Sequence, residues 1–166
     1  MEDKQVKNKT VEESSIFVVQ QMTQSDANLA GNVHGGVIMK LIDNTAGIVA
    51  GRHASSNVVT ASIDRLDFHH PVYVGDLLIV YAAINYVGNT SMEIGARIEA
   101  ENFLSGQRRH TASAYLTYVA LDSNGKPASV PTLTLSSDEE KRRHREAEAR
   151  RKIRLEERRR ERKSQD

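Results

Sequence analysis

Residues 37–50 read VIMKLIDNTAGIVA, and the fold prediction starts from this long, mostly apolar stretch. An ordinary strand has about 5 to 6 residues, so a stretch of this length predicts a buried helix instead. Gly47 and the β-branched residues lower its helix propensity slightly. Gly35 and Gly36 stand just before the stretch, and we expect the helix to end near His53.

The second half of the chain changes to the period of a strand. In residues 92–101, MEIGARIEAE, apolar residues alternate with charged residues and one glycine, which is typical of a strand buried on one face. About five strands and one long helix predict a two-layer α+β fold in which an antiparallel sheet wraps the helix. The other expected strands are residues 16–19, 57–68, 76–87 and 109–121, and the turns that separate the later strands are residues 71–75, 88–90 and 104–106.

The composition fits one folded domain in a reducing environment. Of the 166 residues, 39% are hydrophobic, so the chain can bury a core without disulfides. The absence of cysteine excludes a disulfide scaffold, a Cys-ligated zinc site and a thiol nucleophile. Because we find neither a secretion signal nor a membrane-spanning stretch, we expect a soluble cytoplasmic protein.

The charges are distributed unevenly. Residues 138–166 contain 13 Lys or Arg and 9 Asp or Glu, whereas the rest of the chain contains 10 and 13. The charges of this tail alternate in sign without aromatic residues, which favours a solvated helix over nucleic-acid binding. The alternative is an arm that offers one or two cations to an anionic ligand of the body. We expect a disordered N-terminus (1–12), one domain (13–135) closed by Pro127 and Pro131, and a charged helical tail (136–166).

Three ordered segments carry a family resemblance. Residues 26–36, DANLAGNVHGG, followed by Met39 and Asp43, resemble the signature of the cytosolic acyl-CoA thioester hydrolases of the hotdog fold. Residues 57–64, NVVTASID, and 89–93, NTSME, resemble two further segments of that family. The resemblance implies a long central helix wrapped by a five- to six-stranded antiparallel sheet. It also implies an enzyme that hydrolyses fatty acyl-CoA to free fatty acid and coenzyme A.

The chemistry can also be argued from the residues. Thioester hydrolysis needs an activated water and hydrogen-bond donors for the carbonyl oxygen as charge builds on it. Gly36 stands where a loop becomes a helix, so its N–H is our candidate for such a donor; the alternative is a glycine pair needed only for a turn. Asp43 lies about two helical turns further on the same side, as a lone carboxylate among apolar residues. By resemblance Asp43 is the general base or the nucleophile, and the alternative is a structural Asp bonded to Asn44 or Thr45.

Asn28 matches the catalytic asparagine of the family, which polarises the thioester carbonyl or orients the water. A side-chain amide can donate and accept hydrogen bonds at once. The alternative for Asn28 is a turn-forming role in its loop. We assign no catalytic role to the neighbouring Asn32 and His34.

Coenzyme A is long and anionic, so its site should combine strand backbone with cations. By resemblance Ala61, Ser62 and Ile63 offer a strand edge to the pantetheine, and Thr90, Ser91 and Met92 contact the pantetheine or the nucleotide. In the tail, Lys152 matches a position that reaches coenzyme A in some family members. The alternative for both strand segments is ordinary sheet. Coenzyme A enters as part of the substrate, and no cofactor or metal is expected.

The fold and the site together predict self-association. One helix wrapped by one sheet leaves a sheet edge open, and two units can pair edge to edge. Asn28 and Gly36 of one subunit would then face Asp43 of the other, so we expect a homodimer that assembles by family habit into a hexamer of three dimers. We expect neither a nucleic-acid nor a membrane partner. The alternative functions are a non-catalytic acyl-CoA-sensing module and a hotdog dehydratase.

Overall fold

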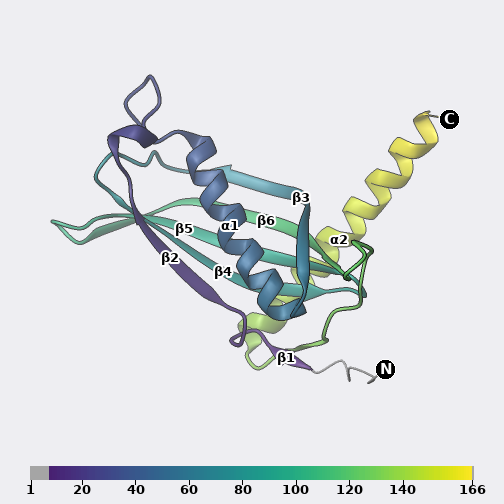
Figure 1. Cartoon of the computed structure of the whole chain (residues 1–166). Coiled ribbons are helices and arrows are strands. Elements are labelled where there is room, and N and C mark those ends of the chain that lie inside the picture. Colours follow the sequence, from purple (N-terminus) through teal and green to yellow (C-terminus); the bar gives the residue numbers. More distant parts are fainter. Residues whose placement is uncertain (1–7, 166) are drawn as a thin grey trace.

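A computed structural model describes residues 8–165, and one long helix, α1 (Gly35–Ala54), lies across one face of a five-stranded sheet (Figure 1). Every neighbouring pair in this sheet is antiparallel, in the order β2-β4-β5-β6-β3. The hotdog arrangement implied by the resemblance is therefore present. The strands are β2 (Ile16–Gln21), β3 (Asn57–Phe68), β4 (Leu77–Val87), β5 (Ser91–Asn102) and β6 (Gln107–Leu121).

The core lies between α1 and the sheet. From α1, Ile42 and Val49 are fully buried, and they belong to one cluster with Leu116 of β6 and Ile94 of β5. Burying each such side chain stabilises the fold by about 1.5–3 kcal/mol. The buried helix predicted from residues 37–50 and the strand predicted from residues 92–101 are thus confirmed as α1 and β5.

Several short elements were not expected from the sequence. Strand β1 (Lys9–Thr10) pairs in parallel with β7 (Leu133–Thr134), and a 3-10 helix, η1 (Gln24–Asp26), lies in the loop before α1. The predicted disorder over residues 1–12 is wrong for residues 9–12, because β1 is paired and Val11 is buried in the core. Residues 1–7 of that prediction lie outside the described residues.

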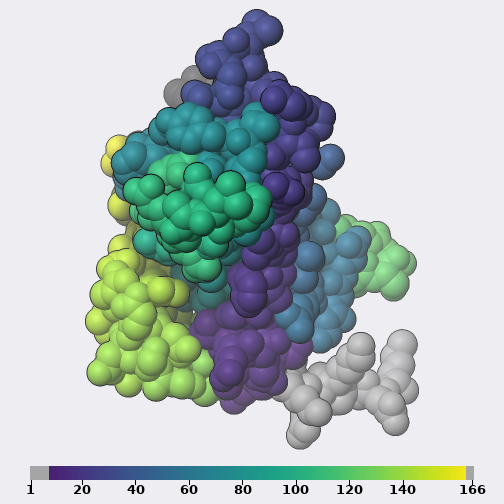
Figure 2. Space-filling model, turned by 90° about the vertical axis from the view of Figure 1, so that its left-hand side faces the viewer, coloured from purple at the N-terminus to yellow at the C-terminus, as the bar shows by residue number. Residues whose placement is uncertain are grey.

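The tail forms a second long helix, α2 (Asp138–Gln165), as predicted. Seen from the β2 edge, α1 and the start of α2 lie on opposite sides of the sheet (Figure 2). We call the α1 side the inner face and the α2 side the outer face. Neither helix in residues 8–165 is long and apolar enough to cross a membrane.

Strand β3 is a free edge of the sheet and carries exposed apolar residues. Val59 is 43% exposed and Ile63 is 41% exposed. Unpaired strand edges with exposed apolar side chains are places where another chain can add. In α1, Met39 and Ile48 are also exposed.

Candidate active site

Asp43 lies in the middle of α1 and is held by two hydroxyl groups. Thr60 Oγ1 of β3 donates to Asp43 Oδ1 at 2.8 Å, and Tyr118 of β6 donates to the same oxygen at 2.7 Å. The Tyr118 hydroxyl also lies 2.8 Å from the Asp43 carbonyl oxygen. Within residues 8–165, Asp43 Oδ2 accepts no hydrogen bond, so one carboxylate oxygen remains available to a water or a substrate.

Tyr118 is a permanent donor in this arrangement. Burial, and then the hydrogen bond to Asp43, raise the pKa of Tyr118 well above its usual value. The phenol therefore stays protonated and fixes the orientation of the carboxylate. Neither Thr60 nor Tyr118 was predicted as a site residue, because only the strand pairing, in which Thr60 is opposite Tyr118, brings them together.

Asn28 lies in the loop before α1, and its side chain shapes that loop. Its Oδ1 accepts from the backbone N–H of Ala30 at 2.9 Å and from that of Asn32 at 3.2 Å. These are the contacts of an Asx-type turn, which was the alternative role for this residue. Because Oδ1 is occupied by the backbone, the Asn28 NH₂ group is the part that can meet a ligand.

The N-terminus of α1 differs from the prediction for Gly36. His34 caps the helix, and its Nδ1 accepts from the Gly36 N–H at 2.9 Å. The Gly36 N–H therefore does not face a ligand in this structure, which corrects the expected oxyanion contact. A Cβ atom on residue 36 would lie 3.0 Å from His34 Nδ1, so glycine allows the ring to approach. The neighbouring Gly35 N–H takes part in no backbone or side-chain bond within residues 8–165.

A cavity of about 340 Å³ brings the loop residues together with the start of α1. Asn28 and Gly35 line it on one side, and His69 and His70 from the segment after β3 line it on the other. His70 Nδ1 lies 2.9 Å from the His110 carbonyl oxygen, which fixes its ring. No sequence pattern pointed to this histidine pair.

Asp43 does not line this cavity in the same chain. Asp43 lies seven positions after Gly36 in the helix, so the two residues are about 10 Å apart along the helix axis. Within one subunit, the cavity and the Asp43 carboxylate therefore lie at two separate places.

The predicted coenzyme A segments lie at the β3 edge and at the start of β5. Thr60 pairs with Tyr118 and Ser62 with Thr117, so Ala61 is the extra residue of a β-bulge. Because of this bulge, Thr60 donates to Asp43 of α1 on the inner face. Ser62 instead donates to Asp64 Oδ1, and the other oxygen of Asp64 pairs with Arg154 of α2 on the outer face.

One of the predicted contacts is changed by the structure. The Met92 side chain is 1% exposed and belongs to the core, so the prediction that it touches coenzyme A is wrong for the side chain. Thr90 and Ser91 lie at the turn before it, where the Thr90 carbonyl accepts from the Ala120 N–H. The Lys152 side chain is 70% exposed on α2, and its one ion pair among residues 8–165 is with Glu148, at 4.0 Å.

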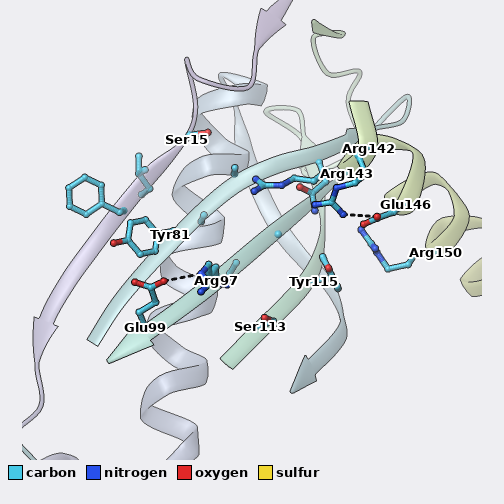
Figure 3. A pocket seen from close by; sticks show the side chains of 17 residues that line it. Ser15, Tyr81, Arg97, Glu99, Ser113, Tyr115, Arg142, Arg143, Glu146 and Arg150 are labelled. Atoms are coloured by element: carbon cyan, nitrogen blue, oxygen red, sulfur yellow. Dashed lines mark hydrogen bonds and ion pairs between the residues drawn. The ribbon is translucent and has the colours of Figure 1, made fainter. Parts of the chain in front are cut away.

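A larger hollow, about 640 Å³, lies on the outer face between β2, the sheet and α2 (Figure 3). Its lining includes Tyr81, Arg97, Tyr115 and Arg150. It contains none of the predicted catalytic residues, whereas Asn28 lines the smaller cavity.

Comparisons with known proteins show to which family the chain is similar. The family model described as the Thioesterase superfamily matches residues 30–103. The chain is 41% identical over 143 residues to the cytosolic acyl coenzyme A thioester hydrolase of Rattus norvegicus, covering 85% of this chain and 38% of that protein. It is 37% identical over 128 residues to an uncharacterized acyl-CoA thioester hydrolase of Bacillus subtilis, covering 77% of this chain and 74% of that protein. The chain thus spans little more than a third of the length of the rat relative.

Two solved structures are similar over nearly the whole chain. The acyl-CoA hydrolase of Staphylococcus aureus, in complex with butyryl coenzyme A and coenzyme A, superposes with a TM-score of 0.87 at 35% identity, covering 94% of this chain and 95% of that chain. An apo hexameric acyl-CoA thioesterase superposes with a TM-score of 0.88 at 38% identity, covering 92% of this chain and 97% of that chain. By its sequence, its fold and these relatives, the chain belongs to the acyl-CoA thioester hydrolase family of the thioesterase superfamily.

Proposed function

We propose that this protein hydrolyses acyl-CoA thioesters to a free acid and coenzyme A. The observation that carries the proposal is the Asp43 carboxylate, which Thr60 and Tyr118 hold at one oxygen while the other oxygen has no partner in the described chain. A carboxylate held in this way is suited to take a proton from water. Family membership supports the same reaction.

The proposed reaction begins when Asp43 takes a proton from a water that adds to the thioester carbonyl carbon. The carbonyl oxygen gains charge and is stabilised by the Asn28 NH₂ group and the Gly35 N–H. The carbon–sulfur bond then breaks, its electron pair leaves with the coenzyme A sulfur, and the proton on Asp43 passes to that thiolate. Water, a carboxylate and hydrogen-bond donors are enough for this sequence, so it requires no cofactor.

The site is complete only in a dimer. Pairing of two β3 edges would bury Val59 and Ile63 and join two sheets into one. In that arrangement Asp43 of the partner subunit reaches the cavity lined by Asn28 and Gly35. The hexameric relative supports a further assembly of three such dimers.

The test is release of free thiol from a panel of acyl-CoA substrates by the wild type, Asp43→Ala and Asn28→Ala. Removing a general base should lower kcat by at least ~100-fold for Asp43→Ala. Asn28→Ala should also lose activity, because a donor for the oxyanion is missing.

One outcome would contradict the assigned residues, and another would contradict the function. Wild-type rates in both variants would show that the carboxylate and the amide do not act in the reaction. Binding of acyl-CoA by the wild type without any release of thiol would instead indicate a sensing module. A matched control is Tyr81→Phe, because Tyr81 lies on the outer face of the sheet and should keep the wild-type rate.

A further inference from the structure

The larger hollow, on the outer face between β2, the sheet and α2, has a floor of small residues (Figure 3). Ala83 of β4 pairs with Gly95 of β5, and both residues line the hollow. A Cβ atom on residue 95 would lie 2.5 Å from Asn85 Nδ2, so a side chain there would collide with this amide. Asn85 is 5% exposed and is fixed by its hydrogen bond to Glu93 at 3.2 Å. The hollow is thus built into the sheet, and its volume of about 640 Å³ is typical of a small-molecule site.

Four arginines line the hollow, and two of them are engaged by carboxylates of the protein. Arg142 donates through all three of its side-chain nitrogens, to Glu139 and Glu146 of α2. Arg150 makes a two-point contact with Glu93 of β5, at 2.7 Å and 3.2 Å. These contacts fix Arg142 and Arg150 as parts of the α2 attachment.

The other two arginines, Arg97 and Arg143, have guanidinium ends without an acceptor. Arg97 of β5 donates through Nε to Glu99 at 2.9 Å, and Arg143 of α2 donates through Nε to Glu139, also at 2.9 Å. In the described part of the chain, the NH₂ groups of both guanidiniums make no hydrogen bond. Both side chains are half-exposed. One arginine from the sheet and one from α2 therefore offer unused donors to the same hollow.

An apolar wall lies on the β2 side of the hollow. The rings of Phe17 and Tyr81 are 5.9 Å apart, and Phe17 is 65% exposed. Tyr81 pairs with Arg97 across β4 and β5, so both side chains share the outer face of the sheet. Figure 3 shows Tyr81 on the β2 side of the hollow and Arg143 on the α2 side. The hollow therefore combines aromatic surface with cationic donors beside it.

The charges of the lining favour an anion over a cation. Its two carboxylates, Glu99 and Glu146, are both paired with arginines of the hollow. A cation would have to compete with these arginines, whereas an anion can bind the NH₂ groups that have no acceptor. A guanidinium holds a carboxylate well because its planar fork donates two parallel hydrogen bonds. An anion with an apolar chain would also cover Phe17, which a bare anion would leave exposed.

We propose that this hollow binds an amphipathic carboxylate, an acid with one carboxylate group and an unbranched apolar chain. The carboxylate binds Arg97 and Arg143, and the chain lies on the floor of small residues against Phe17. This site goes beyond the proposed function, because it is on the opposite face of the sheet from α1 and Asp43 and takes part in no step of the hydrolysis. Since Arg97 belongs to the sheet and Arg143 to α2, the bound carboxylate also ties the helix to the sheet.

Calorimetric titration of the wild type with decanoate tests the site directly. Decanoate should bind, whereas acetate, which lacks the chain, and decyltrimethylammonium, which lacks the negative charge, should not. In Arg97→Met and in Arg143→Met, Kd for decanoate should rise by about tenfold or more, the size expected for losing a hydrogen bond between charged groups. The matched control is Arg158→Met, which removes an exposed arginine further along α2 and should keep the wild-type Kd.

Two further measurements test the chain and the link to α2. Ala83→Leu places a larger side chain on the floor and should raise Kd for decanoate as the arginine variants do. In the wild type, decanoate should slow amide hydrogen exchange in residues 138–150, because the ligand joins α2 to the sheet. Arg143→Met should abolish this protection. Equal exchange with and without decanoate in the wild type would show that the ligand does not bridge the two elements.

An acid is also a product of the proposed reaction, so binding at the catalytic residues has to be distinguished. Asn28→Ala should keep the wild-type Kd for decanoate. Binding that is lost in Asn28→Ala and kept in Arg97→Met would place the ligand in the smaller cavity and overturn the proposal. The titrations involve no hydrolysis, so they decide this site whether or not the proposed function is correct.

Two other outcomes would also overturn the proposal. The first is a wild type that releases or takes up no heat with decanoate and gains no protection in α2. The second is a wild type that does not bind decanoate while Phe17→Ala lowers the oligomeric mass measured by light scattering. That result would show that a second copy of the chain covers the hollow.

Discussion

The chemistry proposed here depends on the surroundings of one carboxylate. Asp43 accepts one hydrogen bond from a hydroxyl group of β3 and another from a hydroxyl group of β6. Both strands therefore fix the direction in which its other carboxylate oxygen points. Tyr118 contributes the more rigid of the two donors, because its ring is part of the core and its pKa is raised by burial.

Replacing Tyr118 by Phe tests this arrangement. The variant keeps the ring in the core and removes only the hydroxyl, so kcat should fall by about tenfold, the size expected for losing one hydrogen bond to a charged group. KM should change little, since the hydroxyl acts through Asp43. Steady-state kinetics checks both values. An unchanged kcat would show that the orientation of Asp43 does not depend on Tyr118.

The sequence alone was enough to select candidate site residues where the residue type and its neighbours along the chain point to the chemistry. Asp43 is a carboxylate inside an apolar run, and Asn28 stands in a loop before a glycine pair. No feature of the sequence distinguishes Thr60 and Tyr118 in this way, because the pairing register of β3 with β6 brings them together. The Gly36 N–H was misassigned because a histidine side chain can cap a helix just as a ligand can.

At the scale of elements, long periodic segments were predictable and short ones were not. The alternation in residues 92–101 and the apolar run in residues 37–50 gave β5 and α1 with ends within about two residues. Strands β1 and β7 have two residues each, which is too short for a period, and they exist because tertiary contacts bring them together. The bulge at Ala61 likewise leaves no sequence signal, although it directs Thr60 and Ser62 to different faces.

His53, near the end of α1, makes the free energy of unfolding depend on pH through its contact with the segment next to β7. Its ring is fully buried, Nε2 lies 2.9 Å from the Pro131 carbonyl oxygen, and Nδ1 has no hydrogen-bond partner among residues 8–165. Nε2 is therefore the donor, and burial, with a smaller contribution from Lys9, lowers the pKa of His53 below its ordinary value of 6.5. The unfolded chain thus binds a proton at this residue more readily than the folded chain does.

The consequence is a loss of stability in acid. The contribution of His53 is complete above about pH 6.5 and decreases as the pH falls below that value, by at most about 1.4 kcal/mol per pH unit for one group. Urea unfolding at pH 8 and at pH 5.5 measures the change. In His53→Gln, whose amide can still donate to Pro131, the decrease between these two pH values should be smaller. An equal decrease in both proteins would mean that other groups cause it.

At the scale of the whole molecule, the proposed site has two parts that lie at different places along α1, and we propose that they act together only across two subunits. The cavity with Asn28 and Gly35 is at the start of the helix, and Asp43 is about 10 Å further along. The free β3 edge with its exposed Val59 and Ile63 offers the surface on which a second copy can complete the sheet. The division between two subunits was expected from the sequence, because both groups occur in a chain with one domain, and it stays a prediction.

We propose that each active site takes its carboxylate, Asp43, from one subunit and its amide, Asn28, from the other. Asp43→Asn and Asn28→Ala are each expected to be inactive alone. When the two are mixed and allowed to exchange subunits, half of the dimers are mixed and each mixed dimer contains one intact site. The mixture should therefore regain about a quarter of the wild-type thiol release. A mixture in which mass spectrometry confirms subunit exchange but thiol release stays at the level of the separate variants would contradict the account.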